Sequence, residues 1–545
     1  MRGFHMAAAV GGLLLLQGAR ASAADTTLQL SGDVPLTGPD HFFVDFDVPP
    51  GTKEIEVAHD DLSAENILDF GVNDPNGFRG WGGGNSEPAI IGELAASRSY
   101  VPGVIGAGTW RVVIGKALIK QTPAKYQLSI TLRDTATLAP QNERAPYAPV
   151  AALEVGSRWY AGDFHVHSVE SGDARPSLDE LASFARGRGL DFALISDHNT
   201  LTQLEFITDA QSRHPKLLLL PGMEYTTYGG HANVIGATQW VDHKIGQPGV
   251  TIQGAVEAFR AQGAIVSLNH PTQDLGDLCI GCAWQHDLDL SLVGAVEVMT
   301  GTPATLDYLP KVKAIDYWET LLDQGYHLPA IGGSDDHRAG VNLTVLQSPI
   351  GDPTTLVFAD ELSVQGIIDG VRSGRTVVKL WGPAEAMAEL SSSVAPQGDT
   401  VTAMATILSA KITGGAGKSV RFVKNGKALG KALVASDPFT HTLEVQSPIS
   451  GEDRYRVEVL DDNGRRTLTS YLWLTAPAVA DAGADAGADA SGTDAGGHNT
   501  GATAAGGGCG CTLAPQARRL GSRGLVFLLP LLLWRRRQWR KRKHG

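Results

Sequence analysis

The stretch Asp163-Phe-His165-Val-His167 opens an ordered series of polar motifs, each of which ends or follows a short apolar run. The later motifs are Ser196-Asp197-His198-Asn199, Gly222-Met223-Glu224-Tyr225, Gly230-His231-Ala232-Asn233, Leu268-Asn269-His270-Pro271 and Ser334-Asp335-Asp336-His337. Successive side chains of a strand point to opposite faces, so residues two apart, such as His165 and His167, project the same way. The pattern predicts that the ends of several buried strands carry histidine and carboxylate groups to one place.

These residue types indicate a metal centre. Neutral imidazole and carboxylate suit zinc, manganese or iron. Six histidines with a glutamate and two aspartates make nine such groups, which exceed the needs of a single four-coordinate ion. Any one histidine beside an apolar strand is more often a hydrogen-bonded structural residue. The whole set is harder to explain that way, because α/β barrels carry their chemistry where buried strands give way to loops. We therefore expect two or three divalent metal ions and no organic cofactor.

The order HxH, DHN, Glu, GH, NHP and SDDH resembles the PHP (polymerase and histidinol phosphatase) metallohydrolases, and within them the CehA/McbA-like group, over residues 157–384. The resemblance implies an α/β fold, a distorted (β/α)7 barrel with metals at the C-terminal ends of its strands. The local pattern agrees with this. A capping box at Ser177 to Glu180 predicts a helix, a strand follows at 191–196, and helices at 251–262 and 305–323 alternate with strands at 264–268 and 294–299.

Carried over by residue, the resemblance assigns three ligand sets. The first is His165, His167, Glu224 and Asp335; the second is Glu224, as a bridge, with His231 and His270; the third is Asp173, His198 and His337. Glu170 competes with Asp173, so a two-metal site stays open.

Residues beside the ligands have expected roles of their own. Asp197 is interpreted as an acceptor that orients a ligand ring, and Asp336 as a structural or supporting carboxylate. Arg338 is the candidate for holding a phosphate or carboxylate, because a guanidinium matches those groups, although an exposed structural arginine fits equally well.

Paired metals lower the pKa of a bridging water and stabilise the entering and leaving oxygens, so a bridging hydroxide would be the nucleophile, with Glu224 and Asp335 holding the ions. The leading hypothesis is a phosphoesterase acting on a small-molecule or short phosphoester substrate. A metal-dependent ester, amide or carbamate hydrolase is the alternative, since a polarised carbonyl accepts hydroxide as well. A third hypothesis is a non-catalytic PHP-like protein that binds a ligand at the cell surface.

The chain has 545 residues, 43% of them hydrophobic, with a formal net charge of −13. That length predicts about three domains. The acidity argues against tight nucleic-acid binding, which depends on basic patches that neutralise phosphates.

The two ends of the chain predict export and anchoring. Residues 1–24 carry an apolar run and an Ala21-Ser-Ala23 cleavage site, as in a secretory signal peptide. Residues 476–508 read as a disordered Ala/Gly/Asp linker. Residues 509–545 join a Cys509-Gly-Cys511 motif, a hydrophobic segment and a basic tail, which resembles the MYXO-CTERM sorting signal. That resemblance implies membrane contact through the C-terminal segment, processing by a sorting protease, and a location at the cell surface or outer membrane, or release after cleavage.

Short alternating strands with Gly and Pro turns predict β-sandwich domains at 25–145 and 385–475. Both are open to two interpretations, a passive spacer or a module that binds carbohydrate or a surface. Cys279 and Cys282 fit a disulfide loop, a redox motif or half of a zinc site, and the disulfide is favoured because export leads to an oxidising compartment.

Overall fold

The computed structural model describes residues 25–301, 313–344 and 347–478. The predicted signal peptide, the first part of the helix predicted at 305–323, nearly all of the linker and the sorting segment lie outside these residues. Within the described ranges, no helix combines the length and apolar character of a membrane span.

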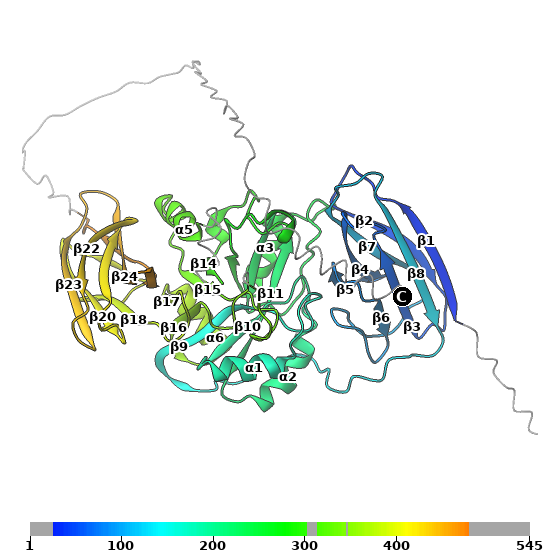
Figure 1. The fold of residues 1–545 in the computed structure, drawn as a ribbon, viewed down its shortest axis with the longest axis horizontal. Coiled ribbons are helices and arrows are strands. Elements are labelled where there is room, and N and C mark those ends of the chain that lie inside the picture. The colour runs from blue at the N-terminus through cyan, green and yellow to red at the C-terminus, as the bar shows by residue number, and fades with distance from the viewer. Residues whose placement is uncertain (1–24, 302–312, 345–346, 479–545) are drawn as a thin grey trace, which may run out of the picture. The chain divides into compact units, whose positions relative to one another are not determined.

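The N-terminal part is built from two four-stranded antiparallel sheets (Figure 1). One sheet has the order β1 (Thr26–Asp33), β8 (Lys125–Arg133), β3 (Glu54–Asp60) and β6 (Ala89–Gly92). The other has the order β2 (His41–Val48), β7 (Gly108–Leu118), β4 (Ile67–Asp74) and β5 (Gly77–Gly83). Their facing side chains, including Trp110 and Ile55, form one buried core. The predicted antiparallel β-domain is confirmed.

The central part contains seven neighbouring strands. They are β9 (Val155–Val166), β10 (Phe192–Ile195), β11 (Leu218–Thr227), β12 (Gly230–Ile235), β13 (Ile265–Leu268), β14 (Ala295–Thr300) and β15 (Ala330–Gly333). Strands β9, β10 and β11 pair in parallel, as do β13, β14 and β15. A parallel bridge between Val166 and Asp336 brings the end of β15 back to β9. The first and last motifs of the series therefore lie beside each other.

Helices connect most of the strands of this sheet. They are α1 (Leu178–Gly187), α2 (Leu204–Arg213), α3 (Ile252–Ala261) and α5 (Ala314–Asp323), with α6 (Val364–Arg372) after the barrel. Ser177 forms the predicted capping box with Glu180, and Thr251 caps α3. Each helix buries an apolar stripe, as Leu181 and Ala185 do on α1. The predicted mixed α/β domain with parallel strands is confirmed.

Strand β12 departs from a strict alternation of strands and helices. It follows β11 through a two-residue turn at Tyr228 and Gly229 and pairs antiparallel with both β11 and β13. So short a turn leaves no length for a crossover helix, which parallel neighbours require. The hairpin places Glu224 and His231 on adjacent antiparallel strands.

The C-terminal strands continue the sheet of the central part. β16 (Thr354–Glu361) pairs antiparallel with β9, β17 (Thr376–Lys379) with β16, and β25 (Gly464–Thr469) with β17. The remaining strands are β18 (Met387–Ser392), β19 (Thr400–Thr402), β20 (Ala405–Thr413), β21 (Ser419–Lys424), β22 (Lys427–Leu433), β23 (Phe439–Gln446), β24 (Glu452–Asp461) and β26 (Leu472–Thr475). The predicted C-terminal β-domain is mainly antiparallel, with one parallel pair between β19 and β26, and it is hydrogen-bonded to the sheet that carries the site.

The approach of β15 to β9 depends on a glycine. A Cβ on Gly333 would overlap the Cβ of His165 and lie 2.7 Å from its backbone nitrogen. We expect Gly333→Ala to lower the free energy of unfolding by about 1–3 kcal/mol, the usual cost of overpacking. Thermal or urea unfolding checks this, with Gly187→Ala as the control, because a Cβ on Gly187 meets no atom within 4 Å. Equal stability of the two variants would contradict the tight β9–β15 contact.

Candidate metal centre

Four side chains from three parts of the barrel converge in what we term the first ligand group: His165, His167, Glu224 and Asp335. Strand β9 ends between the two histidines, β11 carries Glu224, and Asp335 follows β15. Glu224 Oε2 lies 3.4 Å from His165 Nε2 and 3.5 Å from His167 Nε2. Asp335 Oδ1 lies 3.3 Å and 3.1 Å from the same two nitrogens. Four potential ligand atoms therefore surround one point.

The first ligand group fits a divalent ion. The Nε2 atoms of His165 and His167 and Oε2 of Glu224 are buried and have no hydrogen-bond partner in the described structure. Buried polar atoms are normally paired, because an unpaired one costs about 1–3 kcal/mol. Tetrahedral coordination at about 2.0–2.1 Å would separate ligand atoms by roughly 3.3–3.4 Å, close to the observed spacing.

The second ligand group shares Glu224. Its other oxygen, Oε1, lies 3.2 Å from Nδ1 of His231 and 3.4 Å from Nε2 of His270. The two carboxylate oxygens thus face different sets of imidazoles. Such a spacing would suit a carboxylate shared by two ions, which is the role that the family resemblance implies for Glu224.

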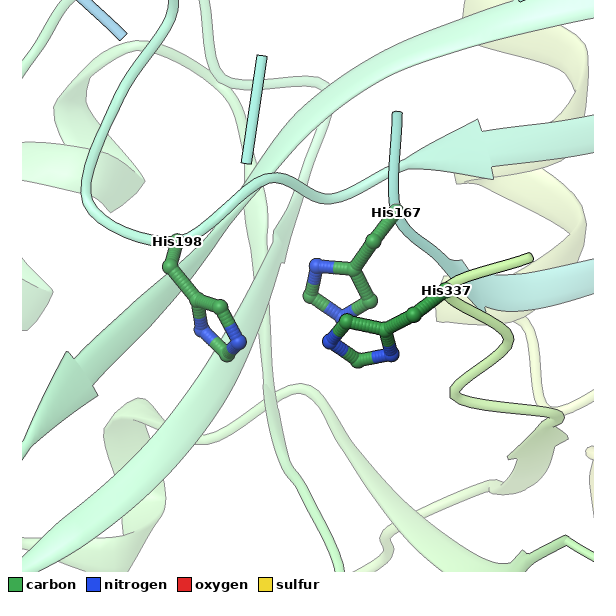
Figure 2. A group of neighbouring side chains, drawn as sticks. All are labelled: His167, His198 and His337. Atoms are coloured by element: carbon green, nitrogen blue, oxygen red, sulfur yellow. The ribbon is translucent and has the colours of Figure 1, made fainter. Parts of the chain in front are cut away.

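The third ligand group contains Asp173, His198 and His337. Asp173 Oδ2 lies 3.5 Å from Nε2 of His198 and 3.2 Å from Nε2 of His337. The rings of His198 and His337 also lie close to His167, and the His167 and His337 rings are stacked 4.1 Å apart (Figure 2). Asp173 of the third group is 57% exposed and Asp335 of the first group is 31% exposed, whereas His165 and Glu224 are at most 1% exposed. Solvent reaches the centre from this side.

Glu170, the competing carboxylate, points elsewhere. Its Oε2 accepts hydrogen bonds from the backbone nitrogen of Ser99 at 3.0 Å and from Thr202 Oγ1 at 2.7 Å. Ser99 belongs to the N-terminal domain, and its hydroxyl donates to the Glu170 carbonyl oxygen. Glu170 therefore fixes the loop that carries Asp173 and leaves Asp173 as the carboxylate beside the histidines.

Glu297, on β14, was missed by the sequence analysis. Its Oε1 lies 3.0 Å from Nδ1 of His165, and its Oε2 accepts from the backbone nitrogen of His270 at 2.8 Å. A carboxylate at Nδ1 keeps the proton there, so that the lone pair of Nε2 faces the first ligand group. A signal was present, because Glu297 is the one charged residue of the apolar strand Ala-Val-Glu-Val-Met-Thr.

Asn269 is a second residue with an unpredicted contact. Its side-chain nitrogen donates to Glu224 Oε1 at 3.1 Å, and its oxygen accepts from the backbone of Asn233. The amide thereby fixes the orientation of the shared carboxylate.

The charges of the centre are strongly coupled. Burial lowers the pKa of His165, but the carboxylates of Asp335, Glu224 and Glu297 outweigh it and raise that pKa well above its ordinary value. Burial raises the pKa of Glu224, yet His165 and His198 bring it well below the usual range. Burial and two neighbouring imidazoles lower the pKa of His167 to about 3. The centre therefore favours ionised carboxylates and bound positive charge, as a cation site requires.

Three charged residues lie near the ligand groups and contact mainly the backbone. Asp197 was predicted to orient a ligand ring, and this is corrected: its carboxylate accepts from the backbone nitrogen and the hydroxyl of Ser168, both at 2.6 Å, and so fixes the loop after His167. Asp336 accepts from the backbone nitrogens of Arg338, Gly340 and Ile350, in agreement with a structural role. The half-buried Arg338 donates to the Asn342 carbonyl oxygen at 3.4 Å.

Known proteins offer similarity in structure but not in sequence. No family model matches the chain, and no curated protein matches it. A two-domain protein of Bacteroides vulgatus, described as containing a predicted PHP-like metal-dependent phosphoesterase, is 19% identical and aligns over 60% of this chain and 99% of its own, with a TM-score of 0.34. A protein of Bifidobacterium adolescentis, provisionally described as a metal-dependent phosphoesterase, is 14% identical over 38% of this chain and 95% of its own, with a TM-score of 0.26. A CARDB domain from Pyrococcus furiosus in complex with di-metal ions is 16% identical over 17% of this chain and 88% of its own, with a TM-score of 0.13.

The contact between Glu297 and His165 gives a prediction about metal affinity. Glu297→Gln removes the charged acceptor at Nδ1, and we expect the affinity for one divalent ion to fall by roughly 10–100-fold, as for other partners of metal-bound histidines. Chelator competition and elemental analysis of the purified protein check this. Glu444→Gln, at an exposed position of β23, is the control, and an equal affinity of both variants would contradict the role of Glu297.

Proposed function

We propose that this chain is a metal-dependent phosphoesterase of the PHP type, related to the CehA/McbA-like group, with a di- or trinuclear centre. One observation supports it most directly. The buried carboxylate of Glu224 presents its two oxygens to different histidine sets, and unpartnered nitrogens of His165 and His167 face it. Such a shared carboxylate is the ligand by which two ions are held close together.

Divalent zinc, manganese or iron at these groups would polarise the ester and lower the pKa of water enough for attack at neutral pH. The residues of the chain would hold the ions and orient the side chains that bind them. Glu297 keeps the Nδ1 proton of His165, and Asn269 fixes Glu224. No serine or cysteine nucleophile is required.

The exposure of the third ligand group supports a direction of approach for the substrate. Asp173 is 57% exposed and His198 24%, whereas Glu224 is 1% exposed. We infer that a small or short phosphoester enters on this side. Arg338 follows His337 directly, and a guanidinium there suits an anionic ester oxygen.

A panel of chromogenic esters tests the proposal. With Mn²⁺ or Zn²⁺, we expect the purified protein to hydrolyse nitrophenyl phosphate or bis-nitrophenyl phosphate in preference to nitrophenyl acetate. His165→Ala and Glu224→Gln should each reduce kcat/KM by more than roughly 100-fold. Each changes a proposed metal ligand itself, and this should cost more than loss of a residue that only hydrogen-bonds to a ligand. Glu444→Gln should retain full activity.

The same panel separates the alternatives. Acetate-selective turnover that is lost in both variants would replace the phosphoesterase with an ester, amide or carbamate hydrolase. Stoichiometric metal without turnover of any ester would favour a ligand-binding protein.

We also propose that the protein is exported and held at the cell surface or outer membrane by its C-terminal segment until a sorting protease processes it. The support is the sequence of residues 1–24 and 509–545. Fractionation of cells that express the full chain, with a chain ending at residue 508 as the control, is expected to show loss of envelope association in the shortened protein. Equal envelope association of both chains would contradict the anchoring role.

A further inference from the structure

A small disulfide loop lies against the second ligand group. Cys279 and Cys282 are bonded, with their Cα atoms 5.6 Å apart, as the sequence favoured. The loop lies nine residues beyond the ligand His270. Its residues are partly exposed except for Cys282, which is buried.

Two backbone carbonyls of this loop meet the two histidines of the second ligand group. His231 Nε2 lies 3.1 Å from the oxygen of Ile280, and His270 Nδ1 lies 3.1 Å from the oxygen of Cys282. A carbonyl oxygen only accepts hydrogen bonds, so each of these ring nitrogens must carry a proton. In the neutral rings the lone pairs are then on His231 Nδ1 and His270 Nε2, the atoms that face Glu224 Oε1.

We propose that the Cys279–Cys282 disulfide loop is a positioning element of the metal centre, which fixes the tautomer and orientation of His231 and His270. The inference rests on the proposed metal site and does not depend on which ester is the substrate.

The way the loop packs supports this role. Gly281 has a φ of +76°, and a Cβ there would overlap the carbonyl oxygen of Thr227 in the β11–β12 hairpin. Beyond the loop, the backbone nitrogen of Gln285 donates to the Gly229 oxygen at 2.7 Å. The hairpin that carries Glu224 and His231 is therefore in contact with the loop on one side, and the disulfide closes the loop on the other.

A disulfide with a purely structural role would mainly affect the stability of the fold and not the binding of metal. The preceding turn η1 (Gly276–Leu278) is exposed, so the segment contributes little to a core. Loss of the disulfide should alter the second ligand group while the stability of the metal-free protein changes little.

The test compares the wild-type protein with Cys279→Ser/Cys282→Ser. Both cysteines are replaced because Sγ of Cys282 lies within 4.8 Å of one ring nitrogen of His231 and one of His270, and a free thiol there would itself bind metal. Chelator competition with Zn²⁺ or Mn²⁺ should show one ion bound roughly 10–100-fold more weakly, with the others unchanged. The thermal midpoint of the metal-free protein is measured in parallel and should stay near that of the wild type.

Leu278→Ser is the matched control, since its side chain is 61% exposed in the same segment, and it should bind every ion as the wild type does. Reduction of the wild-type protein with a phosphine gives a second route if the double variant does not fold. In that reaction the disulfide takes two electrons and two protons to give two thiols, and the phosphine with water becomes phosphine oxide. Histidine ¹⁵N shifts of the metal-free protein should then show a mixture of tautomers at His231 and His270.

Two results would overturn the inference: unchanged affinity for every ion in the double variant, or unchanged tautomers after complete reduction. These outcomes differ from failure of the phosphoesterase proposal, in which the wild-type protein binds its ions but hydrolyses no phosphate ester. Metal binding is measured without substrate, so each proposal can fail alone.

Discussion

The negative charge of the buried Glu224 carboxylate must be compensated, and the rest of the centre depends on this constraint. The side chain is 1% exposed, and an isolated ionised carboxylate in such a place is prohibitively costly. Five imidazoles lie around it, at 2.9 to 3.5 Å from its two oxygens: those of His165, His167, His198, His231 and His270. Each comes from a different strand end or motif apart from the His165 and His167 pair, so the barrel must close before the carboxylate is compensated.

Closure of the barrel is maintained by a second buried carboxylate. Asp163, on β9, accepts hydrogen bonds from the backbone nitrogens of His165 at 2.9 Å, Ser334 at 3.0 Å and Gly351 at 2.7 Å. Burial raises its pKa to about 7, and these hydrogen bonds oppose that rise. The same side chain thus ties β9 to the residue that precedes Asp335, and Gly333 allows the two backbones to approach. His165 and Asp335, which are far apart in the sequence, are therefore set side by side by the Asp163 carboxylate and by Gly333.

The N-terminal β-domain is part of this support. Arg98 donates to the carbonyl oxygen of Ala174 at 2.8 Å, and Ser99 contacts Glu170, on either side of Asp173. Gly172 lies so close to Gly82 that a Cβ would overlap its carbonyl oxygen. The loop that carries the exposed Asp173 is therefore held between the barrel and a domain for which the sequence suggested only a spacer or a binding module.

The sequence by itself determined the mixed α/β class, the β-rich flanking domains and the capped helix at Ser177, because strand alternation and capping boxes are local properties. It also singled out the histidine and carboxylate motifs that the structure brings together, although their assignment to individual metals came from the family resemblance. It did not determine the direction of β12 relative to β11 and β13, since the choice between a hairpin and a crossover connection depends on how neighbouring strands pair. It also left open Asp173 against Glu170, which are three residues apart and chemically alike. Only the tertiary structure decided between them, because the partners that distinguish them, His337 and Ser99, are distant in sequence. The same holds for Glu297 and the carbonyls of the disulfide loop, whose effect on the histidines arises from contacts across the barrel that no local pattern encodes.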